Sequence, residues 1–144
     1  MMLKTHTVCA LIVLSFLFPI MDMSLLSFLA FSLVVLISAV LPDIDSTGLR
    51  IFLAHRGVIH SLTFALLITV LIWPILGFTI AFAFFLGYSL HLAGDMMTVS
   101  GVPLLWPLQI RPRVGLFRVR SITEYIVFYL LSVFFAIRTI QMLL

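Results

Sequence analysis

The sequence predicts an all-α protein, a polytopic membrane helix bundle of about five transmembrane helices in a single domain over residues 1–144. Hydrophobic residues make up 64% of the chain and charged residues only 9%, whereas soluble domains carry about 25% charged residues. The apolar residues form long runs, and the few charges and prolines lie between them. Each interruption therefore marks where one helix ends and the next begins.

The first two apolar runs, Thr7–Ile20 and Ser24–Leu41, are predicted to form a helical hairpin with Asp22 at its tip. Lys4 precedes the first run, which makes a signal peptide the alternative. No small-x-small cleavage site follows the run, so we expect it to be a retained first span.

The third apolar stretch, Leu62 to Val99, is too long for one span. As a single helix its 38 residues would be about 57 Å long, nearly twice the thickness of the hydrocarbon core, about 30 Å. The predicted break is at Trp73-Pro74, because proline removes a hydrogen-bond donor and disfavours helix in the preceding residue. The last span is Ile122–Leu144. The first and third of the five spans are short, which tilt or local thinning of the bilayer would accommodate.

Five spans place the amino-terminal end and the loops 42–60 and 100–121 on one side of the membrane. Arg138 is predicted on the other side. The first side carries the remaining seven of the eight basic residues, which indicates that it is cytoplasmic: Lys4, Arg50, Arg56, Arg111, Arg113, Arg118 and Arg120.

The histidines and acids follow the same asymmetry. Every one of them except Asp22 is predicted at or near the cytoplasmic ends of the spans: His6, Asp43, Asp45, His55, His60, His91, Asp95 and Glu124. Ionisable groups beside membrane spans are costly, so they usually face one another or a wet cavity and serve a function.

Two pairs of these residues have informative spacings. Asp43 and Asp45, in LPDIDS, follow the second span, where a turn directs both carboxylates to one point. His91 and Asp95 stand at i and i+4, on one face of a helix. An isolated pair of this kind is more often a satisfied polar contact between helices, and this alternative stays open.

The motif HRGVIHS places His55 and His60 at the entry to the third span, with Ser61 available as the helix cap. His6 opens the first span, and a position near the lipid headgroups is the alternative for it. Imidazole nitrogens mixed with carboxylate oxygens suit zinc, manganese or iron better than Mg²⁺ or Ca²⁺.

The segments THTVCA, LPDIDS, HRGVIHS and GYSLHLAGDMMTVSGVPLLWP, in this order, resemble the YdjM-like family of LexA-regulated, inner-membrane, metal-dependent hydrolases. The resemblance implies a location in the bacterial inner membrane and a hydrolytic activity. A more distant similarity, through the His-x3-Asp pair, is to zinc-dependent phospholipase C and related nucleases. The family motifs imply a metal centre formed by His6, Asp43, Asp45, His55, His60, His91 and Asp95.

Seven ligands are too many for one catalytic zinc, which takes about three protein ligands and an open position. We therefore expect two divalent ions, zinc with manganese as the alternative, and a metal-activated water that hydrolyses a phosphoester. Asp43 or Asp45 is the candidate general base. Glu124 is a candidate ligand or a support for a ligand histidine, or only a favourable charge at a helix start.

The arginines suggest the substrate. Arg56 lies inside the histidine motif, and we expect it to contact a phosphate at the site. The guanidinium groups of the downstream arginines could also bind the phosphate. Alternatively, these arginines only determine the membrane topology of the chain and bind anionic lipid. Trp106 is placed as an interfacial anchor.

The predicted partner is therefore membrane lipid, with a lipid phosphate as the substrate. Nucleic acid is not expected, because no soluble basic domain or stacking platform accompanies the positive charge. The competing functions are a metal or proton transporter and a non-catalytic protein whose metal only locks the helices.

Overall fold

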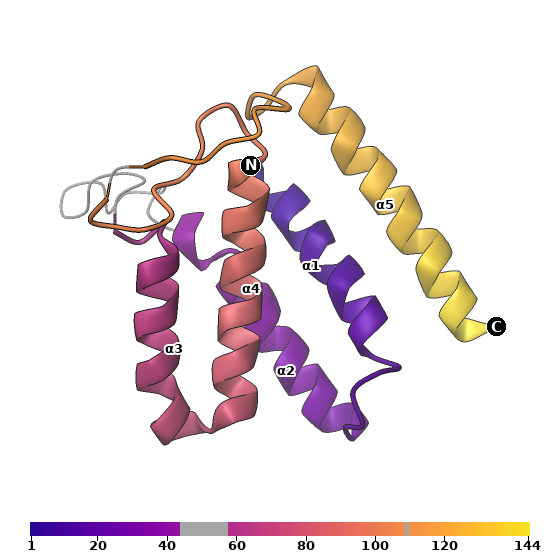
Figure 1. Cartoon of the computed structure of the whole chain (residues 1–144). Coiled ribbons are helices and arrows are strands. Elements are labelled where there is room, and N and C mark those ends of the chain that lie inside the picture. Colours follow the sequence, from indigo (N-terminus) through magenta and orange to yellow (C-terminus); the bar gives the residue numbers. More distant parts are fainter. Residues whose placement is uncertain (44–57, 109) are drawn as a thin grey trace.

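The computed structural model describes residues 1–43, 58–108 and 110–144, and helices account for the regular structure in these ranges. This confirms the predicted all-α membrane bundle (Figure 1). The helices are α1 (Leu3–Leu17), α2 (Leu25–Ser38), α3 (Leu62–Leu76), α4 (Phe78–Met96) and α5 (Ile122–Leu143).

Three of the described helices are long and apolar enough to cross a membrane: α4, α5, and α2 with the turn that continues it to Asp43. The helices α1 and α3 are apolar but have only 15 residues each. At about 1.5 Å per residue they are about 22 Å long, which is less than the hydrocarbon thickness of about 30 Å. A complete crossing by α1 and α3 stays a prediction.

The predicted break at Trp73-Pro74 is wrong, because α3 continues through Pro74 to Leu76. The chain reverses at Gly77, whose φ of 84° lies in the left-handed region that glycine adopts without steric cost. The N–H of Gly77 still bonds to the carbonyl of Trp73, four residues earlier. Proline removes one hydrogen bond from α3, whereas the reversal itself requires a positive φ.

Hydroxyl caps start three of the described helices, with Ser121 in this role at the start of α5. The side chain of Ser24 accepts a hydrogen bond from the N–H of Ser27 at the start of α2, after the exposed turn that contains Asp22. Ser61 accepts one from the N–H of Phe64 at 3.1 Å and so caps α3, as the sequence predicted. Each cap satisfies a backbone donor that the first helical turn leaves unpaired.

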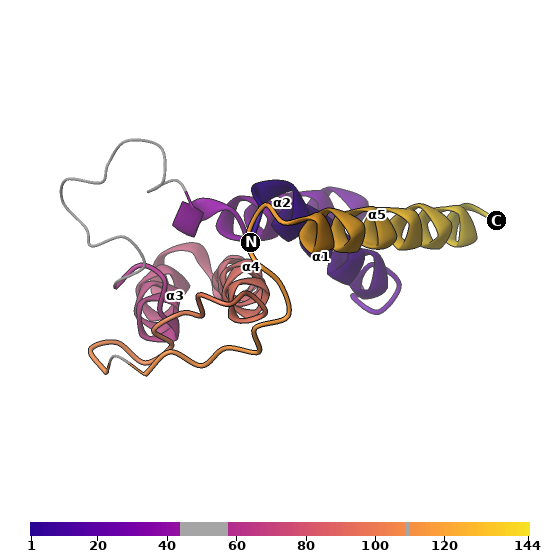
Figure 2. The same ribbon diagram turned by 90° about the horizontal axis from the view of Figure 1, so that it is seen from above.

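The helix α4 is central to the packing, since it contacts α1, α2 and α3. Figure 2 shows α3 and α4 side by side in one layer and α1, α2 and α5 in another. In Figure 1, α5 lies beside α1 and leans away from the other helices. Gly87 permits the close approach of α4 to α2, because a Cβ there would overlap the carbonyl oxygen of Val35 and the hydroxyl of Ser38.

The amino-terminal end of α1, the end of α2, the start of α3, the end of α4 and the start of α5 meet at one end of the bundle (Figure 1). The predicted concentration of ionisable groups at one end is therefore confirmed for the residues that the structure describes. His6, Asp43, His60, His91, Asp95 and Glu124 lie at this end, and Asp22 lies in the turn at the opposite end.

Candidate metal centre

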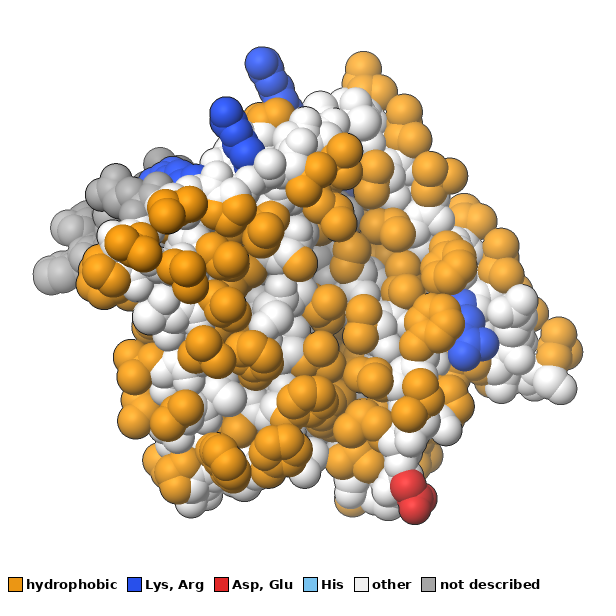
Figure 3. Space-filling view, in the orientation of Figure 1, with side chains coloured by type: hydrophobic (Ala, Val, Ile, Leu, Met, Phe, Trp, Pro, Cys, Tyr) orange, Lys and Arg blue, Asp and Glu red, His pale blue; other side chains and the backbone are white. Residues whose placement is uncertain are grey.

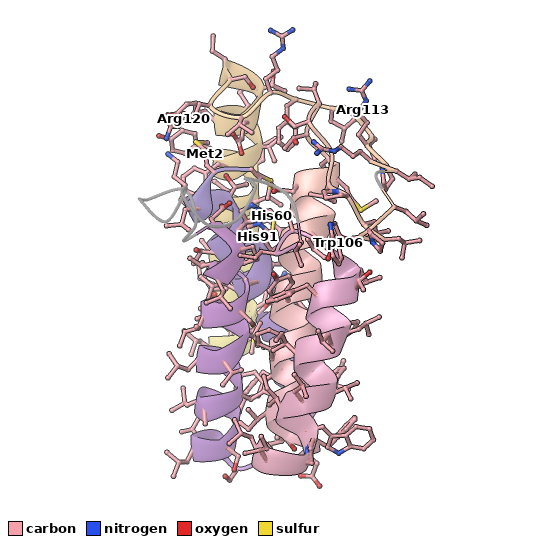
Figure 4. The ribbon with its side chains drawn as sticks, turned by 90° about the vertical axis from the view of Figure 1, so that its left-hand side faces the viewer. Met2, His60, His91, Trp106, Arg113 and Arg120 are labelled. Atoms are coloured by element: carbon pink, nitrogen blue, oxygen red, sulfur yellow. The ribbon has the colours of Figure 1, made fainter. Side chains whose placement is uncertain are left out.

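Four side chains from three parts of the chain converge at this end of the bundle. Asp43 lies in the turn that follows α2, His60 directly precedes the cap of α3, and His91 and Asp95 lie in the last turns of α4. Each offers one ligand atom, and the four atoms lie within 4.8 Å of one another. Figure 4 shows the labelled His60 and His91 side chains together between the helix ends.

The separations between these ligand atoms approach those of a zinc tetrahedron. The Nε2 atom of His91 lies 3.7 Å from Asp43 Oδ1 and 3.6 Å from Asp95 Oδ2, and the Nε2 atom of His60 lies 3.7 Å from Asp43 Oδ1. Ligands about 2.0–2.1 Å from one tetrahedral ion are about 3.3–3.4 Å apart. These three pairs are within a few tenths of an ångström of that separation, and all four ligand atoms lie within 4.8 Å of one another.

The orientation of His91 is set by the backbone of α2. Its Nδ1 lies 2.9 Å from the carbonyl oxygen of Ala39, and because a carbonyl only accepts hydrogen bonds, Nδ1 carries the hydrogen. In the neutral ring, the lone pair of Nε2 then faces Asp43 and Asp95. This Nε2 is buried and has no hydrogen-bond partner among the described residues. A divalent cation would satisfy this nitrogen, and a backbone partner on the other ring nitrogen is typical of metal-binding histidines.

His6 borders this four-residue group. Its ring stacks on that of His91 with the centroids 4.0 Å apart and the planes 13° from parallel. Its Nε2 lies 3.4 Å from Asp95 Oδ1 and 4.0 Å from Asp43 Oδ2. Each carboxylate thus directs one oxygen toward His91 and the other toward His6, an arrangement suited to bridging two ions.

The close approach of α1 to α4 at His6 depends on Gly94. A Cβ at Gly94 would lie 3.0 Å from two atoms of the His6 ring. The amino terminus of Met1 also pairs with Asp95 in this space. Gly87 and Gly94 are seven residues apart, and His91 lies between them on the same side of α4. Small residues therefore flank the ligand histidine.

Tyr88, which lies one turn before His91 in α4, supports the four-residue group. Its hydroxyl donates a hydrogen bond to the carbonyl oxygen of Ile59, the residue before His60. The ring is fully buried between α3 and α4, together with Ala65, Phe84 and Leu92. Tyr88 therefore ties the backbone at His60 to α4, one turn from His91.

Three further residues contribute to the site that the sequence motifs did not single out: Tyr88, Gly87 and Gly94. The sequence feature that could have indicated them is the spacing in GYSLHLAGD. Each of the three residues is three, four or seven positions from another residue on the side of the helix that carries His91. Asp45, His55 and Arg56, which the sequence predicted at the site, lie outside the described residues. The structure brings together the other five predicted ligands: His6, Asp43, His60, His91 and Asp95.

Glu124 is buried, but it does not belong to the four-residue group. One carboxylate oxygen accepts the N–H of Met2 at 2.6 Å and the other accepts the N–H of Arg120 at 2.7 Å. Glu124 therefore joins the start of α1, which carries His6, to the start of α5. Of the roles left open by the sequence, this geometry favours support of a ligand histidine.

We expect Glu124→Ala to destabilise the protein by about 1–3 kcal/mol, because the partly buried N–H groups of Met2 and Arg120 lose their acceptor. Glu124→Gln keeps one carbonyl oxygen and should lie between the alanine variant and the original protein. Thermal unfolding in detergent measures the effect, with Asp22→Asn as the control for loss of an exposed carboxylate. Equal stability of all three variants would show that the contacts to Met2 and Arg120 contribute nothing.

The arginines after α4 lie at the same end of the bundle but away from the histidines. Arg111, Arg113, Arg118 and Arg120 are exposed. Figure 4 shows the labelled Arg113 and Arg120 beyond His60 and His91, at the outer rim of the molecule. Arg113 donates a hydrogen bond to the carbonyl oxygen of Val99 at 3.0 Å. The structure does not bring Arg113 and Arg120 into the metal-ligand group.

Comparison with known proteins agrees with this membrane architecture. The sequence profile of the family described as YdjM inner membrane protein matches residues 1–144. The chain belongs to the YdjM family. The match to YdjM and the apolar helices together support the predicted placement in an inner membrane.

Two curated relatives are each named inner membrane protein YdjM, one from Escherichia coli (strain K12) and one from Shigella flexneri. Each is 36% identical over 98 residues, which cover 55% of this chain and 50% of the relative. The chain therefore spans about half the length of the curated relatives that it matches. No solved structure matches the chain.

Proposed function

We propose that this protein is a membrane-bound metal-dependent hydrolase that cleaves a phosphoester of a lipid or other amphiphile at the cytoplasmic face. The observation that carries the proposal is the Nε2 atom of His91, buried and held by Ala39 so that its lone pair faces two carboxylates. Such an atom, without a hydrogen-bond donor, fits a bound cation.

The four-residue group of Asp43, His60, His91 and Asp95 would hold one ion. His6 and the second oxygens of both carboxylates would begin a second position, to which Asp45 and His55 are the further proposed ligands. Zinc is the first candidate, because a mixed set of imidazole and carboxylate ligands at these separations suits it, and manganese is the second. When bound, the ions would supply an activated water near neutral pH and stabilise charge on the phosphoryl oxygens.

Access to the centre favours Asp43 as the residue nearest to an entering substrate. Its side chain is 25% exposed, whereas those of His60, His91 and Asp95 are at most 2% exposed. The Asp43 oxygen on the His6 side would then accept the proton of a water that attacks from outside, in place of binding the second ion. Asp95 is suited to holding the ion and the neighbouring histidines in place. Asp45 stays the alternative general base.

The depth of the centre favours an amphiphilic substrate. The ligands lie at the ends of apolar helices, where the chain leaves the region that the helices span. The phosphate of a lipid lies at this level of a bilayer, so the scissile bond would reach the ions while the acyl chains remain in the membrane. The arginines at the same end favour the cytoplasmic side.

A transporter is less well supported. Transport requires polar groups that continue across the membrane. Several hydroxyls away from the centre instead donate to carbonyl oxygens of their own helices, such as Ser15 to Ile12 and Thr69 to Ala65, each at 2.7 Å. These hydroxyls do not extend the group of ligands toward the opposite end of the bundle.

Elemental mass spectrometry on the protein purified in detergent tests the proposal first. We expect about two equivalents of zinc or manganese per chain, as in two-metal hydrolases. The loaded protein should then release phosphate or an alcohol from a panel of phospholipids and soluble phosphoesters. No stoichiometric metal after reconstitution with each candidate ion would contradict the proposal and leave a polar network between helices. Stoichiometric metal without hydrolysis would favour a structural metal site.

A further inference from the structure

We infer that the segment between α4 and α5, residues 97–108 and 110–121, is an interfacial loop that binds anionic phospholipid. The lipid would lie in the leaflet on the side of the metal centre. The inference concerns a surface separate from the ligand group and does not rest on the proposed hydrolysis.

The interfacial loop exposes large apolar side chains outside the helices. Seven of them are between 43% and 66% exposed: Met97, Leu105, Trp106, Leu108, Ile110, Val114 and Leu116. A surface of this kind is unfavourable in water, and an exposed apolar patch usually marks a binding surface. Tryptophan in particular is enriched at the level of lipid headgroups.

The positive charge of the loop has no acidic counterpart within it. Residues 97–121 contain Arg111, Arg113, Arg118 and Arg120 and no Asp or Glu. All four arginines are exposed and alternate with the apolar residues. In Figure 4, Trp106 lies level with the labelled histidines, whereas Arg113 and Arg120 lie farther out. This order, with Trp106 deeper and the two labelled cations outside, matches the acyl and phosphate layers of a leaflet.

Hydrogen bonds hold the loop against the helix ends. The N–H of Val114 donates to the carbonyl of Met96 at the end of α4, at 2.9 Å. The carbonyl of Leu104 accepts the N–H of Leu62 at the start of α3, also at 2.9 Å. The side chain of Phe117 is buried, and its carbonyl oxygen accepts the N–H of Val99 at 3.1 Å. With its backbone fixed at both helices, the loop keeps its apolar side chains facing outward.

The surroundings of the loop favour lipid as the occupant. Figure 3 shows hydrophobic side chains running from the helix surface onto the loop, with Lys and Arg side chains projecting beyond them. A membrane that covers the helices therefore continues over the loop. Guanidinium groups bind phosphate through paired hydrogen bonds, and a phospholipid with net negative charge complements four cations better than a zwitterionic one.

Fluorescence of Trp106 tests the inference. The chain has two tryptophans, so Trp73→Phe leaves Trp106 as the reporter. The protein is reconstituted in two vesicle preparations, each a mixture of phosphatidylglycerol and phosphatidylcholine with the same mole fraction of bromine-labelled lipid. In the first preparation only the phosphatidylglycerol carries bromine, and in the second only the phosphatidylcholine carries it. We expect the local preference for phosphatidylglycerol to be at least about fivefold, equivalent to about 1 kcal/mol, the attraction of one basic residue near an anionic surface.

In the same background, replacing Arg111, Arg113, Arg118 and Arg120 by glutamine should abolish the preference. Arg138→Gln, at the opposite end of α5, is the matched control and should leave it unchanged. Circular dichroism checks that the helices are retained. If the fourfold variant does not fold, increasing salt with the unchanged loop must weaken the preference. Equal quenching by both lipids, or quenching of Trp106 by aqueous iodide but not by lipid bromine, would overturn the inference.

Discussion

His91→Ala is expected to lower the affinity for the bound metal by at least about 100-fold, because it removes a direct ligand, and loss of a supporting partner alone already costs about 10–100-fold. The variant also leaves Asp43 and Asp95 facing each other without the imidazole between them. Hydrolysis, if present in the original protein, should fall with the metal content. Elemental mass spectrometry after dialysis against buffered metal measures the effect.

Asp43→Asn and Asp22→Asn form a matched pair for the same experiment. Both remove one carboxylate from the end of a helix or turn, but only Asp43 faces the histidines. We expect loss of metal with Asp43→Asn and full occupancy with Asp22→Asn. If His91→Ala and Asp43→Asn both keep stoichiometric metal, the ions are bound elsewhere and the four-residue group is a polar contact between helices.

Gly87→Leu should produce the largest loss of stability among single substitutions in α4. Even its Cβ would overlap the backbone carbonyl of Val35 and the hydroxyl of Ser38, and a backbone atom cannot move aside as a side chain does. Overpacking usually costs about 1–3 kcal/mol, and we expect the upper end of this range or more. Thermal unfolding in detergent measures the effect.

Separation of α2 from α4 should also weaken the metal centre. Asp43 and Ala39 follow α2, and both approach His91 on α4. Gly87→Ala is the informative milder variant. Alanine in a helix is intrinsically favoured over glycine by about 1 kcal/mol, so a lower melting temperature would have to come from the clash. Ala93→Leu, on an exposed position of α4, is the control and should change neither stability nor metal content. An unchanged melting temperature for Gly87→Leu would contradict this packing.

Much of the fold could be predicted because a membrane imposes simple requirements. Long apolar runs form helices, since each backbone polar group must be satisfied within its own segment. The place where the long run reverses was predicted wrongly. Proline at position 74 is a strong local signal, but the reversal depends on the backbone conformation at Gly77, and many glycines do not mark a turn.

The candidate site was predictable in its residue types and only partly in its arrangement. The free-energy cost of an ionisable side chain in an apolar membrane helix is enough to indicate that His91 and Asp95 face polar partners. That His91 bonds through Nδ1 to the carbonyl of Ala39 could not be predicted, because the two residues are 52 positions apart. Such a contact depends on how closely two helices approach, and Gly87 sets that approach.

By itself, the sequence determined that this chain is a helical membrane protein, and it predicted the histidines and most of the acids at one end, where the described ones lie. The hydrophobicity and charge of each side chain decide whether it prefers lipid or water, and both can be read from the sequence position by position. Only the tertiary structure decided that His6 stacks on His91, that Glu124 holds the start of α1, and that Tyr88 supports the backbone at His60. These contacts join distant segments, and His6 can stack on His91 because Gly94 lets α1 approach α4.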